Sequence, residues 1–160
     1  MQLARAEGGP RRLDQARDLR IAAWIVVDDM ARSINSDCIV LELPDQPVKS
    51  DIDPDAFGIV LRNLIENALR HGLDGRPTDV SLLSDGTLTA ANEAPIVPEA
   101  TLSRLTLRFE RAGGSTGGSG MGLAIVAAIA ECIGSRLVLR SPRPGAESGF
   151  EASLRLPLLH

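Results

Sequence analysis

Four polar side chains recur at helical spacing in "DPDAFGIVLRNLIENALRHG", residues 53 to 72. Asn63, Glu66, Asn67 and Arg70 stand at positions i, i+3, i+4 and i+7, so a helix would place them on one face. The spacing alone also fits a solvated stripe. The residue types favour a site, because asparagine is a poor helix former, an amide oxygen can ligate a hard cation, and arginine suits a phosphate group.

A second chemical feature is the glycine-rich stretch "GGSTGGSGMGLAIV", residues 113 to 126. Gly118, Gly120 and Gly122 alternate directly before an apolar helical run. Such a loop ends at a helix N-terminus, where unpaired amides and the helix dipole favour an anion. Flexible linkers also contain spaced glycines, so the triplet alone is weak. It is neither a dinucleotide-binding fingerprint, because no strand leads into it, nor a P-loop, because Gly-Lys-Ser/Thr is missing.

The elements that must position these features follow from hydrophobic periodicity. We expect helices over residues 13–34, 53–72 and 120–133, the second one with Asp53 as N-cap and Gly72 as its stop. Strands are expected over residues 38–44, 48–52, 78–84, 87–92, 135–141 and 149–157. This order predicts an α+β fold, a two-layer sandwich in which three helices cover one face of a mixed, mostly antiparallel sheet of about five strands.

Composition narrows the function classes. The 160 residues suit one domain, and 44% hydrophobic with 24% charged residues is globular composition. A net charge of −4 and only 2% aromatic residues argue against nucleic acid as a partner. Cys38 and Cys132 are expected to be buried free thiols, and Trp24 a core residue, with an interdomain contact as the alternative. Neither a secretory signal nor an apolar run of membrane-spanning length is visible, so we expect a cytoplasmic domain without membrane contact, which allows a parent anchored in the inner membrane.

The two chemical features occur in an informative order. "NLIENALRHG", followed some fifty residues later by "GGSGMGLAIV", resembles the N box and G2 box of the catalytic ATP-binding domain of sensor histidine kinases, within the wider family of gyrase-like ATPases. The resemblance extends from about Leu19 to Pro157. It implies a Bergerat-type fold that binds ATP with Mg²⁺ and donates the γ-phosphate to a histidine, which makes the parent a histidine protein kinase of a two-component signalling system.

The resemblance also implies residue roles on the first helix face. Asn67 matches the asparagine that ligates Mg²⁺ on the ATP phosphates, and Asn63 lies one turn before it. Glu66 matches the acidic residue that orders or polarises the reacting groups. Arg70 matches the basic phosphate contact, and His71 a position that reaches ribose or phosphate.

Further roles fall on the lid and the loop. "RLTLRFERA" occupies the place of the family's F box, with Thr106 where its first phenylalanine is expected, and Arg111 resembles the lid arginine near the γ-phosphate. The G2-box residues expected around the triphosphate are Gly118, Gly120, Met121, Gly122 and Leu123.

One motif departs from the family pattern. The G1 box reads Asp-x-Gly-x-Gly in the family, and its aspartate accepts a hydrogen bond from the adenine amino group. Here "NEAPIVP" places Asn92 at the aspartate and Ala94 and Ile96 at the glycines. An amide oxygen can accept the same bond without its charge-assisted part, so we expect ATP binding weakened by about 1 kcal/mol.

The resemblance divides the chain and names its partners. Residues 1–12 look like the end of a dimerisation helix and a linker, and residues 13–160 like the catalytic domain. The implied partners are ATP, the parent's own dimerisation and phosphotransfer domain and a response regulator receiver domain, with the parent a homodimer. His71 and His160 are the only histidines, and neither has the context of a phosphate acceptor, so this fragment is expected to bind nucleotide without autophosphorylation.

Two alternatives remain. The altered G1 box also suits a degenerate ATPase fold that docks a response regulator or a kinase partner without nucleotide turnover. A serine kinase of the anti-sigma type would share the fold, but the helix remnant at residues 1–9 favours the histidine branch.

Overall fold

The computed structural model describes residues 12–33, 38–73, 75–102 and 121–159, without the side chains of residues 12–16, 71 and 121. Its main sheet has five strands in the order β2-β4-β5-β7-β6. Their bounds are β2 (Ile39–Glu42), β4 (Thr78–Leu82), β5 (Thr87–Asn92), β7 (Phe150–Arg155) and β6 (Val138–Arg140). β2 and β4 run parallel, whereas the other neighbours are antiparallel.

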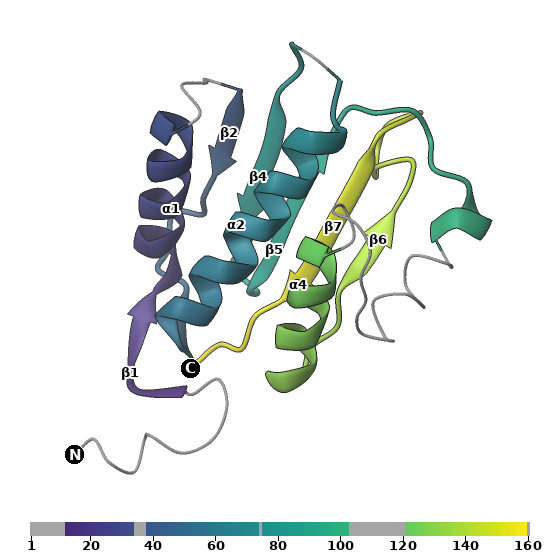
Figure 1. The fold of residues 1–160 in the computed structure, drawn as a ribbon. Helices are drawn as coiled ribbons and strands as arrows, with labels where there is room; N and C mark the ends of the chain where they lie inside the picture. The colour runs from purple at the N-terminus through teal and green to yellow at the C-terminus, as the bar shows by residue number, and fades with distance from the viewer. Residues whose placement is uncertain (1–11, 34–37, 74, 103–120, 160) are drawn as a thin grey trace.

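Three helices, α1 (Leu19–Ser33), α2 (Pro54–His71) and α4 (Met121–Cys132), lie on one side of this sheet (Figure 1). Residues 99–102 are also helical. The expected two-layer α+β sandwich with a mixed, mostly antiparallel sheet is therefore confirmed.

The start of the first helix was predicted wrongly. Residues expected to begin a helix at 13 form β1 (Arg12–Asp18), which pairs antiparallel with β3 (Lys49–Ile52) in a separate two-stranded sheet. Asp18 then ends the strand and begins the helix. Its Oδ1 accepts from the backbone amides of Arg20 (3.1 Å) and Val48 (3.1 Å), the first of which is the bond that an N-cap residue makes.

α2 is the central helix and follows its sequence signals. Asp53 caps it by accepting from the amide of Asp55 at 3.0 Å, and Pro54 occupies its first turn. Its apolar face is fully enclosed, at 0 to 2% exposure, by the sheet and the neighbouring helices. The enclosed residues are Phe57, Val60, Leu61, Leu64, Ile65 and Ala68.

The hairpin between β4 and β5 turns at the expected place. Asp85 Oδ1 accepts from the amide of Thr87 at 2.9 Å, and Gly86 has φ +91°. A Cβ at Gly86 would lie 2.7 Å from the carbonyl oxygen of Leu156, so glycine is required both by conformation and by the close approach of the C-terminal segment.

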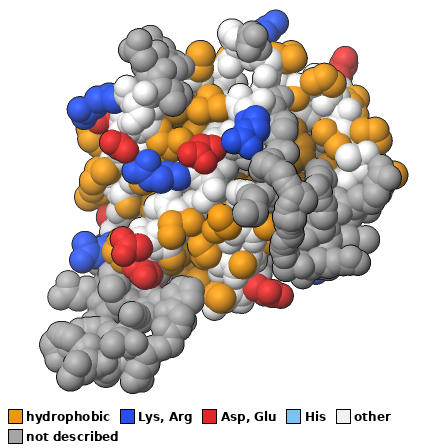
Figure 2. Space-filling model, in the orientation of Figure 1, with side chains coloured by type: hydrophobic (Ala, Val, Ile, Leu, Met, Phe, Trp, Pro, Cys, Tyr) orange, Lys and Arg blue, Asp and Glu red, His pale blue; other side chains and the backbone are white. Residues whose placement is uncertain are grey.

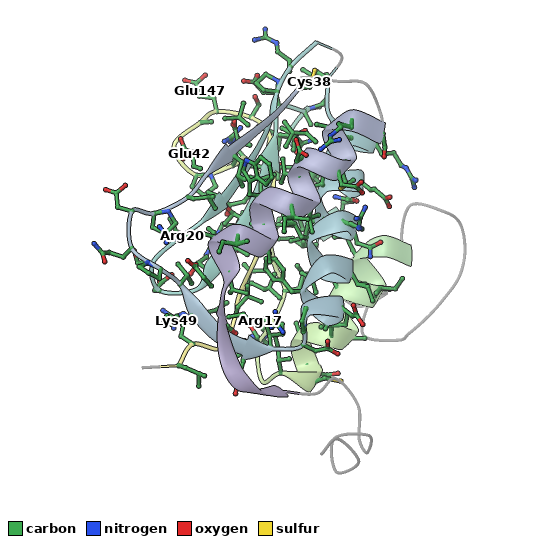
Figure 3. The ribbon with its side chains drawn as sticks, turned by 90° about the vertical axis from the view of Figure 1, so that its left-hand side faces the viewer. Arg17, Arg20, Cys38, Glu42, Lys49 and Glu147 are labelled. Atoms are coloured by element: carbon green, nitrogen blue, oxygen red, sulfur yellow. The ribbon has the colours of Figure 1, made fainter. Side chains whose placement is uncertain are left out.

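Two expectations on burial are wrong. Trp24 is 57% exposed instead of belonging to the core, because α1 turns Ala23, Val26, Val27 and Met30 toward the sheet and leaves Trp24 on its outer side. Cys132, at the end of α4, is exposed, and Cys38, just before β2, is half-buried (Figure 3).

The outer side of α1 is partly apolar. Figure 2 shows hydrophobic side chains at the surface along its left edge, where α1 lies, and Ile21 and Ile25 are exposed there together with Trp24. A hollow of about 310 Å³ is lined by Arg20, Ile21, Trp24, Leu43 and Pro44. None of the helices in the described ranges combines the length and apolar character that crossing a membrane requires.

Candidate functional site

The two stretches that the sequence singles out meet where α4 begins beside α2. A Cβ placed on Gly122 would lie 3.0 Å from Asn63 Oδ1, so any larger residue would crowd the amide where the first turn of α4 approaches the polar face of α2. α2 and α4 are also direct neighbours along their length (Figure 1). The face of α2 that carries the asparagines and the first turn of α4 therefore lie next to each other.

Asn63 presents an oxygen there. Its Nδ2 donates to the carbonyl oxygen of Ile59 one turn earlier, at 2.7 Å, which uses the donor end of the amide and leaves Oδ1 on the side of Gly122. The orientation suits an electron-poor ligand, such as a cation or a hydrogen-bond donor.

The other three polar residues of this face make no side-chain hydrogen bond or ion pair within the described part of the chain. Asn67 is half-buried, and Glu66 and Arg70 are exposed. Arg62 of the same helix contrasts with them, because it pairs with Asp29 of α1 at 2.9 Å. Arg70, on the face of Asn67, is thus left by the described residues for an interaction with an anion.

Asn92, the last residue of β5, is buried at 1% exposure behind the C-terminal turn of α2. Its Nδ2 donates to the carbonyl oxygen of Ala68 at 3.1 Å, whereas Oδ1 is buried with no hydrogen-bond partner among the described residues. Buried polar atoms are almost always paired, so an unpaired acceptor marks a place for a ligand or a water molecule.

Gly72 makes this arrangement possible. A Cβ on Gly72 would lie 2.9 Å from the carbonyl oxygen of Ala68 and 3.2 Å from Asn92 Nδ2. Its φ of −79° is open to any residue, so close approach, not backbone conformation, demands the glycine.

The segment after Asn92 contains no glycine but is held by neighbours. Ala94 is buried and accepts at its carbonyl oxygen from the amide of Gly149 at 2.8 Å, while Ile96 is 51% exposed. The amide of Val97 donates to Ser141 Oγ at 2.8 Å. Sequence reasoning missed Ser141 and Gly149, and only the Pro/Gly-rich character of their turn hinted at them.

The remaining candidate residues are less informative. The side chain of Leu123 is 4% exposed and belongs to the hydrophobic core, so only its backbone could reach a ligand. The side chains of His71 and Met121 lie outside the described atoms, as do Arg111, Gly118 and Gly120 entirely.

The chain matches a known family. The model of the histidine kinase-, DNA gyrase B-, and HSP90-like ATPases matches residues 52–160, which include both helices of the site and the G1 segment. The sensor protein QseC of Escherichia coli O157:H7 is 33% identical over 154 residues, which cover 89% of this chain and 33% of that protein. The chain thus spans about a third or less of the length of the curated relatives it matches.

Solved structures of histidine kinases share the fold of this chain. The mycobacterial sensor histidine kinase MprB superposes with a TM-score of 0.70 at 25% identity, covering 90% of this chain and 97% of that one. The cytoplasmic segment of histidine kinase QseC has the same fold, with a TM-score of 0.63 at 22% identity over 88% of this chain and 72% of that one. The chain belongs to the family of histidine kinase-, DNA gyrase B-, and HSP90-like ATPases.

Proposed function

We propose that this chain is the ATP-binding catalytic domain of a two-component sensor histidine kinase. The observation that carries the proposal is the close approach of the first turn of α4, at Gly122, to Asn63 Oδ1 on α2, because it brings an anion-favouring helix start next to an amide face. Asn92 supplies a buried acceptor at the far end of α2 for the amino group of adenine. Family membership supports this function over a docking module without nucleotide.

The residues of α2 fit a metal-bound triphosphate. No group of three His, Cys, Asp or Glu side chains that could hold a metal exists in the described ranges, so a metal would depend on phosphate oxygens and on few protein ligands. The half-buried amide of Asn67, which makes no hydrogen bond to a described residue, suits that role, with Asn63 one turn before it. Mg²⁺ at this place would neutralise the phosphate charge, as phosphoryl transfer requires.

The other side chains then have distinct tasks. Arg70 binds a phosphate oxygen as a hydrogen-bond donor, and Glu66 orders the reacting groups at the exposed edge of α2. His71, Ala94 and Ile96 border the ribose and the base, and the backbone of residues 118–123 surrounds the triphosphate together with Arg111. Catalysis is mainly positioning and charge neutralisation.

The parent protein supplies the histidine that accepts the phosphate. The γ-phosphate goes to a histidine of the parent's own dimerisation domain and then to a response regulator receiver domain, and the parent is a homodimer whose catalytic domain lies in the cytoplasm. Residues 1–12 lead out of that dimerisation domain. The pairing of β1 with β3 supports a boundary close to residue 13, with residues 13–160 as the catalytic domain.

Calorimetry with ADP and Mg²⁺ tests the proposal. We expect saturable binding that is lost in Asn67→Ala, whereas Arg62→Gln, which changes the α1-facing side of the same helix, keeps it. A melting temperature that does not rise at millimolar nucleotide would favour the docking module instead.

A further inference from the structure

The segment that follows β5 is attached at two points to the turn between β6 and β7. The carbonyl oxygen of Ala94 accepts from the amide of Gly149 at 2.8 Å. Further along the segment, the amide of Val97 donates to Ser141 Oγ at 2.8 Å. Ser141 and Gly149 stand at the two ends of one turn, directly after β6 and directly before β7, so the turn determines where the segment lies.

A single hydroxyl group joins the two attachments. Ser141 Oγ accepts from the amide of Val97 and donates its own proton to the carbonyl oxygen of Gly149 at 2.6 Å. Gly149 uses its carbonyl oxygen for Ser141 and its amide for Ala94. The three hydrogen bonds therefore form one connected network, in which neighbouring bonds strengthen one another.

The residues beside these attachments have little freedom of their own. Pro95 and Pro98 have a fixed φ and no amide proton, so they cannot form other backbone bonds as donors. Ala94 is buried, but Ile96 is 51% exposed and is therefore not held by the core. The place of Ile96 depends on the hydrogen bonds at Ala94 and Val97 on either side of it.

We propose that Ser141 is a positioning residue for nucleotide binding, which acts through the segment from Ala94 to Val97. This inference rests on the proposed function, in which Ala94 and Ile96 border the base and the ribose. The hydroxyl group orders the segment in the free protein. Without it, the segment has to be ordered when the nucleotide binds, and the conformational entropy lost at that moment lowers the affinity.

Calorimetry with ADP and Mg²⁺ tests the inference in Ser141→Ala. We expect the affinity for ADP to fall about five- to tenfold, because the ordering of the segment is moved from folding to binding. Ser81→Ala is the matched control, since it removes the hydroxyl of another half-buried serine, one that is bonded to Thr89 between β4 and β5. The control should lose stability but keep the wild-type affinity. Wild-type affinity in Ser141→Ala, or an equal loss of affinity in Ser81→Ala, would overturn the positioning role.

Hydrogen exchange at the Val97 amide gives a second readout, which reports the bond to Ser141 directly. Ser141→Thr keeps a hydroxyl group and is compared with the wild type and Ser141→Ala. Affinity for ADP should follow the protection of the Val97 amide across the three proteins, so that slow exchange goes with tight binding. A variant with fast exchange and wild-type affinity, or with slow exchange and weakened binding, would contradict the inference.

The wild-type titration separates this inference from the proposed function. If the wild-type protein does not bind ADP with Mg²⁺, the proposed function is wrong and the positioning role of Ser141 is wrong with it. If the wild type binds and Ser141→Ala binds equally well, only the positioning role is overturned.

Discussion

The amide of Gly149 donates to the carbonyl oxygen of Ala94 at 2.8 Å and so joins the turn between β6 and β7 to the segment after Asn92. Ser141 strengthens this connection, because its Oγ donates to the carbonyl oxygen of Gly149 at 2.6 Å and accepts from the amide of Val97 at 2.8 Å. A segment that lacks the usual glycines is thus held in place by the turn that precedes the neighbouring strand β7.

Gly149→Ala should destabilise the domain more than Gly145→Ala. Both glycines have positive φ, +98° and +80°, which costs an alanine about 1 kcal/mol. At Gly149 a Cβ would also lie 2.8 Å from the carbonyl oxygen of Asn92, whereas at Gly145 it meets nothing within 4 Å. Urea unfolding should show a further loss of about 1 to 3 kcal/mol for Gly149→Ala. Equal losses in the two variants would contradict the close approach.

Ser141→Ala should loosen the segment around Val97 locally. The change removes the acceptor of the Val97 amide and the donor to Gly149, each worth about 1 kcal/mol. Hydrogen exchange at the Val97 amide should accelerate by about tenfold, while the amides of β4 keep their rates. Ser148→Ala, an exposed change in the same turn, serves as the control. Unchanged exchange at Val97 would exclude the role of the hydroxyl.

Gly122→Ala should weaken nucleotide binding without unfolding the protein. The added methyl group would lie 3.0 Å from Asn63 Oδ1 and displace the amide or the first turn of α4. We expect ADP affinity to fall about tenfold or more, as for a lost hydrogen bond to a charged group. Gly58→Ala, on the same α2 but with open space around the new Cβ, should keep the affinity and raise stability by about 0.5 to 1 kcal/mol. Full affinity in Gly122→Ala would argue against a ligand between these helices.

Acid should destabilise the domain partly through Asp18. The hydrogen bond from the Arg20 side chain, together with those from the backbone amides of Val48 and Arg20, lowers the pKa of Asp18 below its usual value. Because this pKa is lowered on folding, Asp18 stabilises the fold above the unfolded-state value near 3.9, and this contribution is lost as the pH falls through the lowered native value. Figure 3 shows Arg20 at the start of α1, from which its guanidinium also donates to the carbonyl oxygen of Asp45 at 2.8 Å.

Asp18→Asn keeps a side chain that can cap α1 but loses the charge that faces Arg20 at 2.9 Å, so it should reduce stability near pH 7 by about 1 kcal/mol. The difference from wild type should shrink as the pH is lowered below about 4. Melting temperatures measured between pH 7 and pH 2.5 check this expectation, with Glu147→Gln in an exposed turn as the control. A constant difference across that range would show that the carboxylate charge of Asp18 is not what stabilises the native state.

Local patterns predicted most of the fold. The 3.6-residue period of α2, its Asp53 and Pro54 start and the Asp85-Gly86 turn are short-range signals, and all of them appear in the structure. The start of α1 was mistaken because residues 12–18 pair with β3, which lies about thirty to forty residues further along the chain, and no local periodicity reveals such a pairing. Trp24 was mistaken for a related reason, since hydrophobicity says that a residue can be buried but not which side of a helix the sheet will cover.

The site, too, has a part that local patterns predicted and a part that depends on contacts between distant residues. Spacing alone placed Asn63 and Asn67 on one helix face, and the proximity of Asn63 to Gly122 agrees with the motif order. The bond from Asn92 to the Ala68 carbonyl could not be predicted, because it joins a strand end to a helix turn through a backbone atom that carries no sequence signature. Ser141 and Gly149 were missed on similar grounds, since they act through hydrogen bonds to backbone groups that are distant in the sequence.

The asparagines at positions 63 and 92 share one feature, a nitrogen tied to a helical carbonyl of α2. The side-chain conformational entropy of both asparagines is therefore lost during folding and not on ligand binding. Either oxygen would therefore be oriented before a nucleotide binds to it. This preorganisation would compensate for part of the affinity that is lost when a neutral amide replaces a carboxylate.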